Sequence, residues 1–93
     1  MPSRTVIVGS RTGLHARPAA LFVAAAAAAP VAVTIRTVER GPVPANSMLS
    51  VLSLGAKCGT EVTIAAEGAG ADGALDALAD LLVQDLDAEA ADA

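Results

Sequence analysis

The sequence predicts an α+β fold of two layers, in which one sheet is covered on one face by helices. Segments with the two-residue period of strands alternate with helical segments in the order β-α-β-β-α-β-α. The turn sequence Arg40-Gly41-Pro42 separates the two middle strands, which therefore pair as an antiparallel hairpin. That pairing favours an α+β sandwich over a doubly wound sheet. The 93 residues suit a single domain over residues 1–87, with 88–93 as a frayed tail.

The first strand and the first helix are expected within residues 4–29. R-T-V-I-V-G, at residues 4–9, is a short run of the β type. A helix is predicted from Pro18 to Ala29, because proline suits a helix start, alanine has high helix propensity and Pro30 stops the helix. The uncharged run at 19–35 could be taken for a signal peptide or a membrane span. Alanine is only weakly hydrophobic and a proline interrupts the run, so we expect a soluble protein without membrane insertion.

Two strands and a short helix are predicted in the middle of the chain. Residues 31–36 alternate between apolar and smaller or polar side chains, which is the period of a half-buried strand. A short strand around Val43 follows the turn and pairs back. In N-S-M-L-S-V-L-S-L-G, at residues 46–55, serines recur every third residue among apolar ones. This pattern predicts a short helix that ends at Gly55.

The last strand and the last helix surround a glycine-rich segment. Residues 60–67 alternate as a strand does. The final helix carries one apolar stripe and one acidic stripe: Leu75, Leu78, Leu82 and Leu86 on the first, Asp76 and Asp80 on the second. Residues 68–73 satisfy G-x-G-x-x-G, the pattern of dinucleotide-binding sites. Only twenty residues follow Gly73, too few for a second parallel strand, so we interpret the segment as a flexible turn.

Charge is distributed unevenly along the chain. Residues 1–57 contain all six basic residues and one acid, Glu39, for a net charge of +5, whereas residues 58–93 contain nine acids and no base, for −9. The first half is therefore expected to handle an anion, with the acidic part serving as a solvated face. Phe22 is the only aromatic residue, so recognition of single-stranded nucleic acid by base stacking is not expected.

The single cysteine limits the possible chemistry. Cys58 cannot form an intramolecular disulfide, which suits a reducing cytoplasm. No second histidine exists to activate its thiol, so we expect Cys58 to be a filler or surface residue and not a nucleophile. A metal site is not expected either, because one histidine and one cysteine are too few ligands.

The only histidine stands in R-T-G-L-H-A-R-P-A-A, at residues 11–20. His15 falls just before the predicted helix, where free N–H groups and the positive end of the helix dipole favour an anion. Arg17 adds a guanidinium suited to phosphate oxygens. An imidazole, with an ordinary pKa of about 6.5, is a nucleophile near neutral pH. These residues leave two interpretations open: a histidine that accepts a phosphoryl group, or a surface histidine that caps the helix.

Two segments resemble the signatures of a known family. G-L-H-A-R-P-A-A, at residues 13–20, resembles the active-site signature of HPr, the histidine-containing phosphocarriers of the bacterial phosphoenolpyruvate:sugar phosphotransferase system. N-S-M-L-S-V-L-S-L-G-A-K, at residues 46–57, resembles the second signature, and the resemblance extends from Val6 to about Leu82. It implies a four-stranded antiparallel sheet with three helices on one face, an open-faced sandwich that agrees with the element order.

The resemblance also implies a phosphoryl relay. The matching histidine, His15, would accept a phosphoryl group on Nδ1 from phosphorylated enzyme I and pass it to the IIA unit of a sugar permease, with assistance from Arg17. Met48 and Leu49 match an apolar patch that docks partners. The phosphoryl group passes directly between histidines, so no metal or cofactor is implied. The expected protein is a cytoplasmic, monomeric carrier without catalysis of its own.

The chain also departs from the family pattern. Family members often carry lysines where this chain has Ala24, Ala27 and Asn46. Ser47 matches a serine that an ATP-dependent kinase phosphorylates in some members, but the start of the second helix already explains a serine there as an N-cap, and the missing lysine at Asn46 favours the cap. Two other functions remain open: a regulatory module of the same fold that carries no phosphate, and an adaptor without chemistry. The presence of His15 argues against the first.

Overall fold

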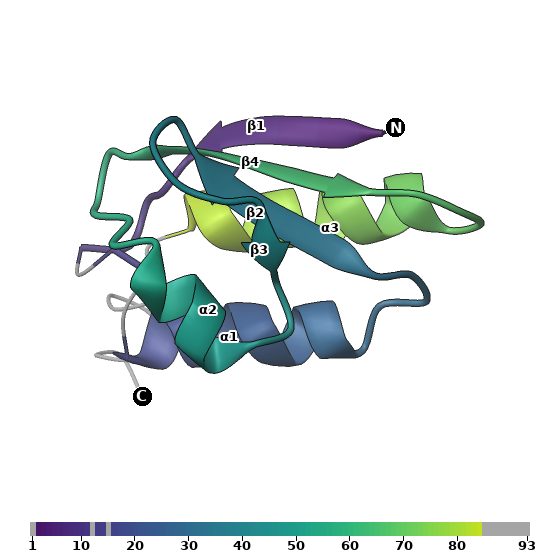
Figure 1. Cartoon of the computed structure of the whole chain (residues 1–93), viewed down its shortest axis with the longest axis horizontal. Helices are drawn as coiled ribbons and strands as arrows, with labels where there is room; N and C mark the ends of the chain where they lie inside the picture. Colours follow the sequence, from purple (N-terminus) through teal and green to yellow (C-terminus); the bar gives the residue numbers. More distant parts are fainter. Residues whose placement is uncertain (1, 12, 15, 85–93) are drawn as a thin grey trace.

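The computed structural model describes residues 2–11, 13, 14 and 16–84, in which four strands form one antiparallel sheet and three helices cover one of its faces (Figure 1). In chain order the elements are β1 (Ser3–Ile7), α1 (Ala16–Ala27), β2 (Val33–Thr37), β3 (Val43–Pro44), α2 (Met48–Ser53), β4 (Glu61–Ala66) and α3 (Ala71–Val83). The strand order across the sheet is β1-β4-β2-β3. The predicted α+β open-faced sandwich is thus confirmed.

The register of the sheet follows from the hairpin and from the central position of β4. β4 pairs with β1 on one side, where Thr5 lies opposite Thr63, and with β2 on the other, where Ile35 lies opposite Ile64. The predicted hairpin is present, and Val43 of β3 pairs with Ile35. Since every pairing is antiparallel, each strand shows alternate side chains to the helices and to the open face of the sheet.

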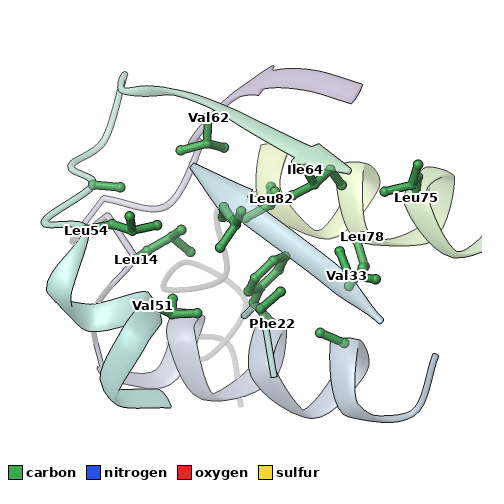
Figure 2. Packing of buried hydrophobic residues seen from close by; sticks show 14 of the residues in the cluster. Leu14, Phe22, Val33, Val51, Leu54, Val62, Ile64, Leu75, Leu78 and Leu82 are labelled. Carbon is green, nitrogen blue, oxygen red and sulfur yellow. The ribbon is translucent and has the colours of Figure 1, made fainter. Parts of the chain in front are cut away.

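The hydrophobic core fills the space between the sheet and the helices. Figure 2 shows the Phe22 ring extending from α1 into the middle of this space, and the side chain is fully buried. β4 alternates as predicted, with three side chains buried against the helices: Val62, Ile64 and Ala66. α3 buries the predicted stripe: Leu75, Leu78 and Leu82. Leu86, the fourth residue of that stripe, and the tail predicted at 88–93 lie outside the described residues.

The bounds of the helices differ from the predicted ones in an informative way. α1 begins at Ala16, two residues before Pro18. Proline is tolerated there because N–H groups in the first turn have no acceptor within the helix, so its missing N–H costs no hydrogen bond. α1 also ends at Ala27, earlier than predicted. α2 ends at Ser53 with Leu54 as its C-cap, and Gly55 follows with a left-handed φ of 63°, so the prediction that Gly55 ends this helix is confirmed.

The acidic part of the chain presents a solvated face, as predicted. Asp72, Asp76 and Asp80 of α3 are exposed. Arg4 of β1 reaches two of them: its Nε donates to Asp76 Oδ1 at 2.9 Å, and its terminal nitrogen lies 3.3 Å from Asp72 Oδ1. The hydrogen bond that Arg4 donates to Asp76, followed by the one to Asp72, raises the pKa of Arg4 above its ordinary value. These ion pairs connect the edge strand β1 to α3.

The glycine-rich segment at 68–73 forms the turn into α3. Ala71 N donates to Gly68 O at 3.2 Å, and α3 starts immediately after Gly70. A Cβ at Gly70 would lie 2.9 Å from Cγ of Pro30, so glycine allows the turn to approach the α1–β2 connection closely. The interpretation as a turn is therefore confirmed. Among the helices described, none has the length and hydropathy that crossing a membrane would require.

Candidate functional site

The first part of the β1–α1 connection is hydrogen-bonded to the end of α3. Gly9 N donates to Leu82 O at 2.9 Å, and the Ser10 hydroxyl donates to Gln84 O at 3.2 Å. The last carbonyls of a helix have no donor within the helix, so these two groups supply donors from outside. Ser10 is only 2% exposed. The beginning of the loop is thus held by main-chain atoms at the far end of the sequence.

The same loop is then held by the segment that follows α2. Gly13 N donates to Ser10 O, and Leu14 N donates to Ala56 O, both at 2.9 Å. The Leu14 side chain is buried in the core near Leu54 (Figure 2). The residue that comes directly before the histidine is therefore fixed by both its main chain and its side chain.

His15 itself lies outside the described residues, in the sequence between Leu14 and Ala16. Arg17, in the first turn of α1, is exposed, and that turn contains no acidic residue. The helix's own side chains therefore do not neutralise the positive end of its dipole, and an anion is favoured at this end. This arrangement can stabilise a phosphoryl group near the start of α1.

Ser47 has the geometry of an N-cap. Its backbone is extended, with φ −113 and ψ 114, and its Oγ accepts a hydrogen bond from Ser50 N at 3.3 Å. Its backbone carbonyl accepts from Val51 N at 3.0 Å, the first bond of the helix. Ser47 thus has a structural role, as expected, and a regulatory role would come in addition to it.

The two residues of the predicted docking patch differ in their environments. Leu49 is 81% exposed, whereas Met48 is partly buried and packs against the core. Leu49 is among the most exposed large apolar side chains described, and only Val38 of the same group is comparable at 82%. Leu49 therefore provides free apolar surface, whereas Met48 mainly packs α2 against the core.

The two signature segments are neighbours in the structure. α1 and α2 pack against each other, and the bond from Leu14 N to Ala56 O joins the start of the first segment to the end of the second. Figure 1 shows α2 lying beside the first half of α1. The fold therefore brings the chain on both sides of His15 close to the helix that carries Ser47 and Leu49.

Depressions on the described surface lie elsewhere. One, of about 290 Å³, opens between the β2–β3 connection and the end of α2; its lining residues are Thr37, Val38, Glu39, Leu54, Gly55, Thr60 and Glu61. Its two carboxylates would repel a phosphate. None of the candidate residues lines this depression. Within the described ranges, no group of three or more histidine, cysteine or acidic side chains is placed to hold a metal ion.

Comparison with known proteins shows the family to which the chain belongs. Residues 2–84 match the family model described as the PTS HPr component phosphorylation site. The chain belongs to the HPr family of phosphocarriers. A curated HPr, the phosphocarrier protein of Streptomyces coelicolor, is 49% identical over 87 residues, which cover 94% of each chain. The family of this chain is therefore that of the phosphotransferase-system phosphocarriers.

Solved structures of the HPr family agree with the fold. The crystal structure of an HPr from Thermoanaerobacter tengcongensis has a TM-score of 0.83 and 38% identity, covering 88% of this chain and 91% of the other. A dimer of HPr from the same organism has a TM-score of 0.66 at 38% identity, covering 87% and 92%. Crh, the catabolite repression protein of Bacillus subtilis, was solved as a swapped dimer and has a TM-score of 0.68 at 39% identity, covering 88% and 93%.

Sequence reasoning missed two residues of the loop. Gly13 has a positive φ of 72°, and a Cβ there would lie 2.3 Å from Ala56 O. Its place in G-L-H was a usable signal, since glycine is the residue that accepts such a conformation. Ser10 offered no signal, because its partner Gln84 lies 74 residues away in the sequence.

Proposed function

We propose that this chain accepts a phosphoryl group on Nδ1 of His15 from phosphorylated enzyme I and passes it to the IIA unit of a sugar permease. The family match over residues 2–84 carries this proposal. The geometry around the histidine supports it, because Leu14 is fixed on one side and the first turn of α1 begins on the other. An acceptor histidine must be held on both sides, by Leu14 and by the first turn of α1, since transfer depends on alignment of the reacting atoms.

Each transfer exchanges one nitrogen–phosphorus bond for another. The unprotonated Nδ1 of His15 attacks phosphorus, and the bond to the donor imidazole breaks. Both rings keep a proton on their second nitrogen, so the donor imidazole leaves as a neutral group. The second transfer repeats this step with His15 as the donor and restores the starting carrier. The protein therefore acts as a carrier and not as an enzyme, and direct transfer needs no cofactor.

Arg17 is proposed to stabilise the charge of the phosphoryl group during transfer. Arg17→Ala is expected to lower the rate of phosphorylation by enzyme I about a hundredfold to a thousandfold, as the loss of a charge-stabilising donor does. Because the side chain is exposed, the free energy of unfolding should change by less than about 0.5 kcal/mol. Stopped-flow transfer and urea unfolding measure the two quantities. Arg36→Ala, at an exposed arginine of β2, is the control; an unfolded Arg17 variant or one with the full rate contradicts this role.

Leu49 is proposed to supply most of the apolar surface that contacts partners, and the partly buried Met48 a smaller part. Leu49 is exposed, and the neighbouring positions where relatives often carry lysines, Ala24, Ala27 and Asn46, are exposed and uncharged in this chain. Contact with enzyme I and IIA should therefore depend on apolar area more than on ion pairs. An ATP-dependent serine kinase is a further proposed partner, acting on Ser47.

Phosphate at Ser47 should weaken partner docking without harming the fold. Its negative charge would lie at the N-terminus of α2, where the helix dipole tolerates it, but also next to Leu49, where burial against a partner is costly. Ser47→Asp should keep a normal melting temperature and raise the Michaelis constant for enzyme I. Ser47→Asn is the matched control, since it retains a capping side chain without charge. Equal kinetics for both variants would leave Ser47 as a cap only.

The proposal includes a cytoplasmic monomer that forms one domain over residues 1–87. Solved relatives include dimers, so the state of association needs its own measurement. Sedimentation at several protein concentrations should give the mass of one chain. A mass that rises toward two chains with concentration would replace the monomer by a self-associating carrier.

One experiment tests the function as a whole. Incubation with phosphoenolpyruvate and enzyme I, followed by intact mass, should show one added phosphoryl group that is labile to acid and stable to base. Addition of a IIA unit should then remove it. A regulatory module of the same fold that carries no phosphate, or an adaptor, would gain no such group from enzyme I.

A further inference from the structure

Ser10 is the one polar residue whose side chain is buried within residues 2–11, 13, 14 and 16–84. It is 2% exposed, and its hydroxyl donates to Gln84 O at 3.2 Å, just after the end of α3. The surrounding core is apolar, and an alanine would occupy the position without burying a polar group. The hydroxyl therefore calls for a role beyond filling space.

The neighbouring glycine shows how closely the loop and the helix end approach each other. Gly9 N donates to Leu82 O at 2.9 Å, and a Cβ on Gly9 would lie 2.0 Å from Val83 O. That contact is with the main chain, so a larger residue could not be accommodated by a side-chain rotation. Two donors of the loop thus occupy carbonyls that a helix end leaves without partners.

Beyond this contact, backbone hydrogen bonds hold the loop as far as Leu14, the residue before His15 in the sequence. Ser10 O accepts from Gly13 N at 2.9 Å, and Leu14 N donates to Ala56 O at 2.9 Å. We propose that Gly9, Ser10 and the end of α3, together the α3 latch, position the His15 loop for phosphoryl transfer. Ser10 is then a positioning residue that acts through the loop. This inference rests on the proposed phosphocarrier function.

The α3 latch should affect the transfer step and not docking. Ser10→Ala is expected to lower the maximal rate of phosphorylation by enzyme I about tenfold, because small misplacements of a reacting group cost large factors in rate. The Michaelis constant should stay unchanged, since Met48 and Leu49 lie on α2. Loss of the hydrogen bond to Gln84 O should leave the melting temperature within about 8 °C of the parent.

A control and a second variant separate the latch from general stability. Thr34→Val removes another partly buried hydroxyl that donates to a backbone carbonyl, Ala65 O at 3.5 Å, on the central part of the sheet. It should leave the maximal rate unchanged. Gly9→Ala disturbs the latch from the other side and should show the same loss of rate. If Ser10→Ala and Gly9→Ala act through one contact, the double variant should lower the maximal rate by less than the product of the two single factors.

The outcomes distinguish this inference from the function on which it rests. Failure of the parent protein to gain a phosphoryl group would refute the proposed function; the latch would then be judged by amide exchange at Gly13, which should be faster in Ser10→Ala than in Thr34→Val. With the parent active, the latch is refuted if Ser10→Ala keeps the full maximal rate, changes only the Michaelis constant, or fails to fold. A lower maximal rate with an unchanged Michaelis constant supports it.

Discussion

His15→Ala is expected to lose phosphorylation by phosphoenolpyruvate and enzyme I, with a rate at least about a thousandfold below that of the parent, as happens when a nucleophile is removed. His15 is the only imidazole in the chain, so no other side chain can form a phosphohistidine. Intact mass at a series of times gives the rate. Unfolding curves should show that the variant remains folded.

Two further variants make this result specific. The exposed Cys58 and the partly buried Ser47 are other groups that could carry phosphate, as a thiophosphate or a phosphate ester. Cys58→Ser and Ser47→Ala should both retain full phosphorylation by enzyme I, although the second loses about 1 kcal/mol of stability with its cap. Retention of an acid-labile phosphoryl group by His15→Ala would show that the acceptor is elsewhere.

Gly13→Ala is expected to destabilise the protein by about 2–4 kcal/mol, an effect at the upper end for single substitutions. Two causes add. Gly13 has a φ of 72°, which costs a residue with a Cβ about 1–2 kcal/mol. The new Cβ would also lie 2.3 Å from Ala56 O and 2.6 Å from Lys57 Cα, so the main chain must move. That movement would break the bond from Leu14 N to Ala56 O, and phosphoryl transfer should slow as well.

Gly55→Ala provides the matched control for Gly13→Ala. Gly55 has a similar φ of 63°, but nothing lies within 4 Å of the Cβ that an alanine would add. The control should therefore show the conformational cost alone, about 1–2 kcal/mol. Urea unfolding of both variants gives the comparison. Equal losses of stability in the two variants would mean that the closeness of Ala56 O does not prevent a Cβ at position 13.

Much of the fold was predictable because local patterns carry it. The alternation in residues 60–67 marks the buried face of β4, and the leucine spacing in α3 marks the side that packs on the sheet. Ser47 was predictable as a cap, because its hydrogen bond joins residues only three positions apart. The position of His15 near a helix start followed in the same way, from the residues that surround it.

Other features were not specified by the local sequence pattern. The start of α1 at Ala16 was missed, since the proline that suggested a later start is equally acceptable inside the first turn. The difference between Leu49 and Met48 arises because only one of them faces the core, which a pattern of two adjacent apolar residues does not specify.

The sequence by itself determined the α+β class, the hairpin, the helix caps and the histidine signature, because each depends on residues close together in the chain. The tertiary structure decided how the loop before His15 is held. Ser10 meets the end of α3 across 74 residues, and Gly13 and Leu14 lie against the segment after α2. Those contacts exist only once the sheet has brought both ends of the chain together, since the propensities that predict strands and helices act over a few residues.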